Sequence, residues 1–284
     1  MGTYSGKRNL RIKDKKIQLS HNTVNMYDVE SHIAELYDIQ QDNSQDIELL
    51  RKLLQDHESL YILEPFCGTG RIFLPLLLDG HHISGLDQAQ DMLDYAALKI
   101  SRLSEEIQTR IKLQQMDVVE ESWPEGFNLV ILGGNCFYEL ATGADQRKCV
   151  QKASHSLKPG RYVYIDNDHM ESELASSWIE PGVTKAFPTG ICSDGTRIES
   201  FCEVIWYDKS EKLVRFRRLT DVKFQDGKVL SKEYIQQKHP VSMDEVKQWL
   251  ESYGFIIHHI FGDWAGNPYN EKSPRVIFWV QKQQ

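Results

Sequence analysis

Short apolar runs alternate with amphipathic stretches along the first part of the chain. Runs rich in apolar residues predict five strands, at residues 60–64, 82–87, 110–116, 127–132 and 162–166. Apolar side chains at helical spacing predict helices around them, at residues 49–54, 70–78, 89–103 and 143–157. Apart from Asn128, the fourth run is apolar throughout, which is typical of a strand buried on both faces of a parallel sheet. This alternation of strand and helix predicts a doubly wound α/β sheet.

The pattern changes at about residue 171. Alternating apolar and polar residues predict three strands there, at residues 196–207, 214–224 and 229–237. Asp226-Gly227 between the last two is a hairpin signal, so we expect a small antiparallel β lid inserted after strand five. Ser242 and Glu245 have the spacing of a capping box at the start of a helix. That helix and an antiparallel pair of closing strands are expected at residues 242–253, 255–261 and 275–281.

A glycine turn follows the first predicted strand and carries the chain's clearest chemical signal. Gly68 and Gly70 let the backbone pass close to a ligand where a side chain would collide. Asp87 ends the second strand, where a carboxylate can accept hydrogen bonds from both hydroxyls of a ribose. The strand–turn–helix–strand unit therefore predicts a site for an adenosine-containing cofactor.

Two details indicate which cofactor this is. The third glycine of a dinucleotide-binding turn is replaced here by Phe73. Glu64 ends the first strand, and a carboxylate there would repel a pyrophosphate but suits a ligand with an ammonium and a sulfonium. S-adenosylmethionine has both groups.

The turn resembles motif I of the class I S-adenosylmethionine-dependent methyltransferases, acid-x-x-x-Gly-x-Gly, which is filled here by Glu64, Gly68 and Gly70. The likeness extends over roughly residues 45–284, and it implies a doubly wound, seven-stranded Rossmann-like methyltransferase sheet. The stretches 133–140 and 157–160 and the lid are similar to the glycine/sarcosine-type small-molecule N-methyltransferases. The resemblance implies transfer of a methyl group to a nitrogen, or less favourably an oxygen, of a small molecule by direct in-line displacement.

The resemblance also implies three groups of cofactor contacts. Those expected at the methionine part are Glu64, Cys67, Gly68, Gly70 and, closing over it, Tyr27 or Tyr37. Those expected at the adenosine are Asp87 on the ribose and Gln88, Met92, Asp117 and Val118 around the adenine. Those expected beneath the donor methyl are Gly133, Gly134 and Asn135. Ordinary structural roles remain open for several of them: a turn acid, a core methionine, packing tyrosines or a turn-capping asparagine.

Candidate catalytic residues lie where strands four and five end, because ligands gather at that edge of open α/β sheets. They are Tyr138, Asp168 and His169. His169 is a candidate general base, although a histidine beside an acid is also a common structural pair. Glycine-type relatives place an arginine just after strand five, but residues 166–170 contain acids and no arginine, which favours an amine, a cation or a hydroxyl-rich acceptor. Arginines of the lid could restore carboxylate binding, but alternating arginines on strands are usually solvated; they are Arg197, Arg215, Arg217 and Arg218.

Composition narrows the class of protein. The net charge of −8 argues against a nucleic-acid-binding surface. Five cysteines without a C-x-x-C pair, and ten histidines without ligand spacing, indicate reduced thiols and no metal site. No apolar run approaches the length of a membrane span and the N-terminus lacks a secretory signal, so we expect a cytoplasmic protein without membrane contact. Monomer and homo-oligomer remain equally open.

Three parts are expected: an N-terminal segment, 1–44, that partly closes the cofactor site; a methyltransferase core, 45–170 and 239–284; and the inserted lid, 171–238. Other functions stay open as alternatives. A nucleic-acid methyltransferase shares the Pro-Phe-Cys-Gly turn, but it needs an Asn/Asp-Pro-Pro-Tyr/Phe loop where this chain has residues 133–137. A protein methyltransferase, a module that binds S-adenosylmethionine without turnover and an NAD-dependent oxidoreductase are the remaining alternatives.

Overall fold

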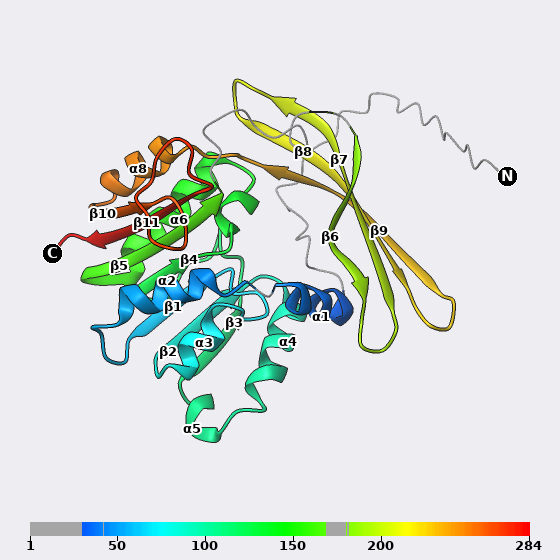
Figure 1. The fold of residues 1–284 in the computed structure, drawn as a ribbon, viewed down its shortest axis with the longest axis horizontal. Coiled ribbons are helices and arrows are strands. Elements are labelled where there is room, and N and C mark those ends of the chain that lie inside the picture. Colours follow the sequence, from blue (N-terminus) through cyan, green and yellow to red (C-terminus); the bar gives the residue numbers. More distant parts are fainter. Residues whose placement is uncertain (1–29, 42, 169–179, 181) are drawn as a thin grey trace.

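The structure is a computed structural model that describes residues 30–41, 43–168, 180 and 182–284. Two β-sheets organise the chain (Figure 1). The larger sheet lies among helices, and the smaller one extends away from it on the right of that view.

The larger sheet has seven strands in the order β10-β11-β5-β4-β1-β2-β3. Their bounds are β1 Tyr61–Pro65, β2 His82–Asp87, β3 Ile111–Gln115, β4 Phe127–Leu132, β5 Leu157–Asp168, β10 Phe255–Phe261 and β11 Arg275–Lys282. β1 to β5 pair in parallel, whereas β11 runs antiparallel to both β5 and β10. The predicted doubly wound sheet with a closing antiparallel hairpin is confirmed.

Helices cover both faces of this sheet. One face is covered by α2 Gln45–Leu54, α3 Phe73–Leu78 and α4 Gln90–Ile100, whose leucines and isoleucines pack on Ile62, Leu129 and Ile131. The other face is covered by α6 Gly143–Ser156 and α8 Met243–Ser252, which pack on Leu63, Val130 and Val163. Because successive side chains of a strand point to opposite faces, one apolar run serves both cores. The short α5 Glu105–Gln108 and the 3₁₀ turn η1 Cys136–Glu139 complete the core, and α8 begins with the predicted capping box.

The smaller sheet is the predicted lid, inserted between β5 and α8. Its antiparallel strands are β6 Val183–Ile191, β7 Arg197–Asp208, β8 Leu213–Lys223 and β9 Val229–Lys238, in that order. β7, β8 and β9 correspond to the three predicted strands. β6 was missed because it contains Pro188 and Gly190, which are depleted in strands; as an edge strand it tolerates both.

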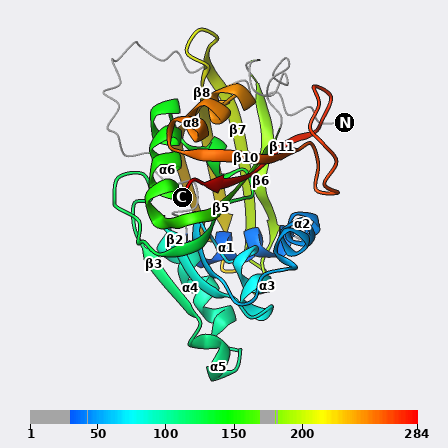
Figure 2. The ribbon, with the colours of Figure 1, turned by 90° about the vertical axis from the view of Figure 1, so that its left-hand side faces the viewer.

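Two further differences from the sequence-based prediction affect the site. Helix α1 Glu30–Gln40 was not predicted, because its apolar residues, Ile33, Ala34 and Leu36, are few and gain burial only against distant elements. It contacts α4 of the core and β6 of the lid, and it lies between the two sheets (Figures 1 and 2). β5 begins at Leu157 rather than near residue 162, because Pro159-Gly160 is a sequence typical of a turn and hides the first part of the strand.

Candidate active site

The glycine turn after β1 leaves the space that a close ligand needs. Gly68 has a φ of +53°, and nothing lies within 4 Å of the position that a Cβ would take there. A Cβ on Gly70 would lie 2.3 Å from the Phe73 ring, so the phenylalanine at position 73 requires a glycine at position 70. The Cys67 side chain is buried beneath the turn, and its amide donates a hydrogen bond to the Leu86 carbonyl oxygen at the end of β2. The turn is thus anchored to β2 and open above Gly68.

Asp87 holds the turn from the end of β2. Its Oδ2 accepts a hydrogen bond from the Gly68 amide at 2.8 Å, and its Oδ1 accepts one from the Ala89 amide at 2.9 Å. Burial raises the pKa of Asp87, although hydrogen bonds from the backbone of Ala89, Gly68 and Gln88 oppose the rise. Each carboxylate oxygen can accept further hydrogen bonds, as ribose hydroxyls would require.

Glu64 is a buried carboxyl group with one oxygen that has no protein partner. Its Oε2 makes no hydrogen bond, and its side chain is almost entirely buried. Burial raises the pKa of Glu64 to about 8, while the charge of Arg71 opposes the rise and the charges of Asp46 and Asp87 add to it. A buried, unpaired acceptor of this kind is what a cationic ligand would satisfy.

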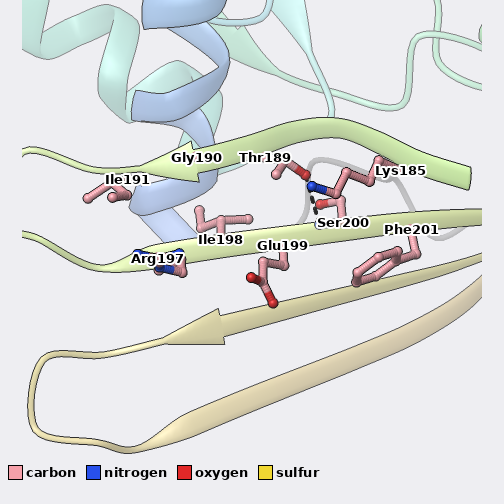
Figure 3. Close-up of a pocket in the computed structure, with 9 residues that line it drawn as sticks. All are labelled: Lys185, Thr189, Gly190, Ile191, Arg197, Ile198, Glu199, Ser200 and Phe201. Atoms are coloured by element: carbon pink, nitrogen blue, oxygen red, sulfur yellow. Dashed lines mark hydrogen bonds between the residues drawn. The ribbon is translucent and has the colours of Figure 1, made fainter. Parts of the chain in front are cut away.

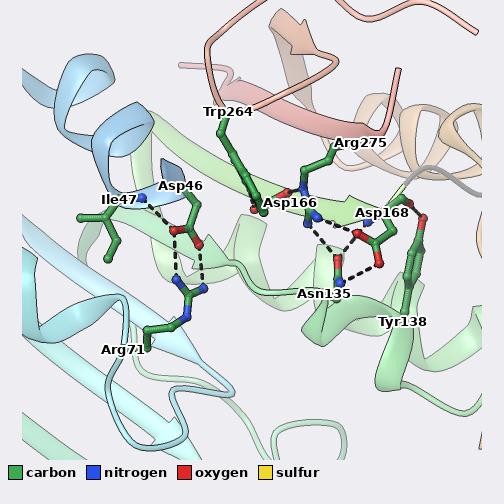
Figure 4. Close-up of polar contacts among 9 residues, drawn as sticks. All are labelled: Asp46, Ile47, Arg71, Asn135, Tyr138, Asp166, Asp168, Trp264 and Arg275. Atoms are coloured by element: carbon green, nitrogen blue, oxygen red, sulfur yellow. Dashed lines mark hydrogen bonds and ion pairs between the residues drawn. The ribbon is translucent and has the colours of Figure 1, made fainter. Parts of the chain in front are cut away.

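The Arg71 guanidinium acts on Glu64 but pairs with Asp46. Arg71 donates to both oxygens of Asp46, with Nη2 to Oδ2 at 2.6 Å and Nη1 to Oδ1 at 2.9 Å (Figure 4). It also donates to the Asn43 carbonyl oxygen. Asp46 lies at the start of α2, so this buried ion pair fastens α2 to the glycine turn. Sequence reasoning missed it, because the two residues lie in different elements without a shared motif.

Helix α1 covers the same turn. The Thr69 hydroxyl donates to Asp38 Oδ1 at 2.8 Å, and the Lys99 ammonium reaches that oxygen at 2.6 Å. Burial raises the pKa of Tyr37, and its side chain packs beside Ala89 and Met92 and against the Phe187 ring of the lid. Of the two predicted tyrosines, Tyr37 thus lies on the helix that covers the turn, whereas Tyr27 lies outside the described residues.

A hollow of about 240 Å³ lies beside the ends of β2 and β3 and contains two of the residues predicted around the adenine. Its lining residues are Gln88, Gln115, Met116, Asp117 and Glu121. Asp117 Oδ1 accepts from the amides of Val119 and Glu120, and Val118 is buried, with its carbonyl oxygen accepting from the Trp123 indole. Met92 does not line the hollow: it is 1% exposed and packs with Ala34, Ala89 and the two tyrosines of α1 and α4.

At the ends of β4 and β5 a polar network joins Asn135, Asp166, Asp168 and Arg275 (Figure 4). Asn135, with a φ of +64°, follows the Gly133-Gly134 loop after β4. Its side chain accepts from the Asp168 amide at 2.8 Å and donates to Asp168 Oδ2 at 2.9 Å. Predicted to lie beneath the donor methyl, Asn135 thus also ties the end of β4 to the end of β5.

Arg275 is the residue of this network that sequence reasoning missed. From β11 its guanidinium reaches Asp166 Oδ1 at 2.7 Å, Asp168 Oδ1 at 2.6 Å and Asn135 Oδ1 at 2.9 Å. It also stacks on the Trp264 ring, whose indole donates to Asp166 Oδ2. The predicted closing hairpin could have indicated this residue, because antiparallel pairing of β11 with β5 sets Arg275 directly opposite Asp168. No arginine directly follows strand five in the sequence, but Arg275 lies beside its end in the structure. The charges of Asp166 and Asp168 are therefore partly neutralised before an acceptor binds.

Two of the three predicted catalytic residues, Tyr138 and Asp168, lie together at this network. The Tyr138 hydroxyl donates to the Asp168 carbonyl oxygen, so Tyr138 braces the end of β5. The Asp168 side chain is 51% exposed despite its pairing, and it is the accessible acid of the network. His169 lies outside the described residues.

A separate hollow of about 190 Å³ lies on the lid, between β6 and β7 (Figure 3). Its lining mixes charged and apolar side chains, among them Lys185, Arg197, Glu199 and Phe201. Arg197 is one of the lid arginines considered from the sequence, whereas none of the predicted cofactor-binding or catalytic residues lines this hollow. In the described part of the chain no cluster of three His, Cys, Asp or Glu residues could hold a metal ion. No described helix combines the length and the apolar character needed to cross a membrane.

Comparison with known proteins agrees with this geometry. A family model described as a methyltransferase domain matches residues 62–160, which include the glycine turn, Asp87, Asp117 and Asn135. The chain is 24% identical to "Putative methyltransferase YqeM" of Bacillus subtilis over 224 residues, 78% of this chain and 83% of that protein. It is also 24% identical to the glycine N-methyltransferase of Rattus norvegicus, over 51% of this chain and 52% of the rat enzyme.

Solved structures show the same fold. An S-adenosylmethionine-dependent methyltransferase from Clostridium acetobutylicum superimposes with a TM-score of 0.67 at 14% identity, covering 88% of this chain and 96% of the other. The sugar N-methyltransferase KedS8 from Streptoalloteichus superimposes with a TM-score of 0.66 at 14% identity, covering 97% and 99%.

The site fits the cofactor of this family. Glu64 has an unsatisfied buried oxygen for a cation, the backbone above Gly68 is open, and Gln88 and Asp117 line a hollow beyond Asp87. The matched domain, the related sequences and this donor set support a class I methyltransferase that uses S-adenosylmethionine.

Proposed function

We propose that the protein transfers a methyl group from S-adenosylmethionine to a nitrogen of a small molecule. The observation that carries this proposal is the arrangement around Glu64 and the glycine turn, which offers a buried carboxylate to the charged end of the cofactor. Solved structures with this fold include a sugar N-methyltransferase and a glycopeptide N-methyltransferase, and part of the chain is similar to a glycine N-methyltransferase. These relatives support a nitrogen on a small acceptor over nucleic acid or protein.

We assign the cofactor contacts as follows. Glu64, the backbone of residues 67–70 and Tyr37 hold the methionine part; Asp87 holds the ribose; Gln88, Asp117 and Val118 hold the adenine. We assign Met92 an indirect role, in which it supports α4 and Ala89 by packing and does not line the hollow. Tyr27 remains a second candidate for the methionine end.

The cofactor supplies a methyl group that is already activated, so the protein's task is to align the nucleophile with it. Asn135 and Asp168 lie together at the end of β5, and each carboxylate oxygen of Asp168 can accept one more hydrogen bond from an acceptor amine. An ammonium must lose a proton before it can attack, and we propose His169, which directly follows Asp168, as the group that takes it. α1 and the lid would exclude water from this edge of the sheet. We also propose that the enzyme acts in the cytoplasm, which agrees with its five unpaired cysteines.

Calorimetry with S-adenosylhomocysteine tests the cofactor site, and product analysis with amines and hydroxylated metabolites tests the acceptor. We expect binding that Glu64→Ala and Asp87→Ala each weaken, and methylated nitrogen in the product. Absence of binding by the wild type, or binding by both variants as tight as by the wild type, would refute the cofactor site. Methyl transfer to oxygen alone would refute the nitrogen acceptor.

A further inference from the structure

Arginines on the two faces of the lid sheet differ in their surroundings. Cross-strand pairing places Arg218 of β8 between Cys202 of β7 and Tyr234 of β9, on the same face as Gln236 and Lys238. Arg217, the preceding residue, points to the opposite face and forms an ion pair with Glu203. The face that carries Arg218 is the one that meets the core.

This inner face touches the turn that follows the β4 loop. Gln236 donates to Glu139 Oε2 at 2.5 Å, and Lys238 forms an ion pair with the other oxygen of Glu139. Arg218 in turn donates from Nε to Gln236 Oε1 at 3.0 Å. Glu139 ends η1, which begins next to Asn135, and its charge acts on the pKa of both Tyr37 and Tyr234. Arg218 is therefore linked through two side chains to the edge of the sheet where methyl transfer is expected.

Positive charges outnumber negative charges around Glu139 on this face. Burial would raise the pKa of Glu139, but the charges of Lys238 and Arg218, with hydrogen bonds from Lys238 and Gln236, together hold the pKa below its ordinary value. Glu139 thus forms an ion pair with Lys238 and interacts with Arg218 only at longer range, and no carboxylate within the described residues forms an ion pair with the partly buried Arg218. A guanidinium presents several donors in a planar fork, which matches a carboxylate or a phosphate.

We propose that Arg218 binds an anionic group of the methyl acceptor, a carboxylate or a phosphate, with the Tyr234 side chain beside it. This inference rests on the function proposed above. The acceptor is then an amine with an acidic group: its nitrogen lies near Asp168 and Asn135, and its anion points to the inner face of the lid. Arg218 sets the choice of acceptor and does not take part in methyl transfer.

Arg218→Gln tests the proposal, and Arg217→Gln is the matched control, because it removes the same charge one position away on the outer face. S-adenosylhomocysteine binding is measured first on all three proteins. Turnover is then followed as S-adenosylhomocysteine release with paired amines: ethanolamine against serine, ethanolamine against phosphoethanolamine, and tyramine against tyrosine. We expect turnover of anionic members only, with KM raised about ten- to a hundredfold in Arg218→Gln and unchanged in Arg217→Gln.

A second measurement decides the matter when none of these amines is an acceptor. Thermal unfolding of the protein loaded with S-adenosylhomocysteine is compared in inorganic phosphate, acetate and chloride at equal ionic strength. We expect phosphate or acetate to raise the Tm of the wild type and of Arg217→Gln but not of Arg218→Gln, and the more effective anion identifies the acidic group. Equal responses of the two variants, or turnover of neutral amines as fast as of their anionic partners, would overturn the proposal. Absence of S-adenosylhomocysteine binding by the wild type would instead count against the proposed methyltransferase function, on which the role of Arg218 rests.

Discussion

Cofactor affinity should depend on the protonation of Glu64. With a pKa of about 8 in the free protein, this carboxyl group is mostly protonated at neutral pH. A cationic ligand binds the ionised form, so binding requires release of the proton. For a pKa of about 8 the ionised fraction is roughly 1% at pH 6 and about half at pH 8, so the Kd for S-adenosylhomocysteine should fall about fiftyfold between these values.

Calorimetry at pH 6, 7 and 8 measures this change directly. At pH 7 the ionised fraction is roughly 10%, so repeating the titration in buffers of different ionisation enthalpy should show release of about 0.9 proton per ligand. Glu64→Gln is the control, because it keeps the shape of the side chain and cannot ionise. The amine of the ligand titrates equally with both proteins, so the difference between them isolates Glu64. If wild type and Glu64→Gln show the same pH dependence and the same proton release, the assignment of Glu64 to the cationic end of the cofactor is wrong.

Three further outcomes are expected. The pKa of Glu64 in the folded protein lies above its ordinary value of 4.5, so its contribution to stability is complete below that pH and is lost as the pH rises towards 8. In denaturant titrations without ligand, the free energy of unfolding of the wild type relative to that of Glu64→Gln should therefore fall by about 1.4 kcal/mol per pH unit from pH 5 to 8. A difference between the two proteins that does not change with pH would contradict the buried, unpaired state of Glu64. Arg275→Met should destabilise the protein by about 3–5 kcal/mol, since it leaves Asp166 buried without its cation; a loss below about 1 kcal/mol in the same assay would show that the network contributes little. His169→Gln should lower kcat roughly a hundredfold and remove the acidic limb of the kcat profile, with unchanged S-adenosylhomocysteine binding, and a retained limb would exclude His169 as the base.

Local patterns were enough to predict the main sheet. The β4 run predicted at 127–132 coincides with the strand, because a buried parallel strand is apolar along nearly its whole length. The capping box at Ser242 likewise marked the start of α8. β6 and α1 were missed for the opposite reason, since Pro188 and Gly190 weaken the strand pattern, and Ile33 and Leu36 become buried only against the lid.

Parts of the candidate site could not be predicted from the sequence because they depend on pairing between distant segments. The glycine turn and Asp87 lie within one supersecondary unit, so their spacing along the chain indicated their joint role. Arg275 reaches Asp166 and Asp168 only through the antiparallel register of β11 with β5. The orientation of Arg218 towards the core, and of Arg217 away from it, depends in the same way on the register of the lid strands.

Helix α1 has a consequence for the order of events at the site. On one side Asp38 bonds Thr69 of the glycine turn and Lys99 of α4. On the other, Gln40 donates to the Thr189 carbonyl oxygen and Glu35 accepts from the Ser193 amide, both in the lid. One helix of about three turns thus contacts both the glycine turn and the lid, so a displacement of the turn would reach the lid through α1. We therefore expect donor binding to precede acceptor binding, in a compulsory rather than a random kinetic order.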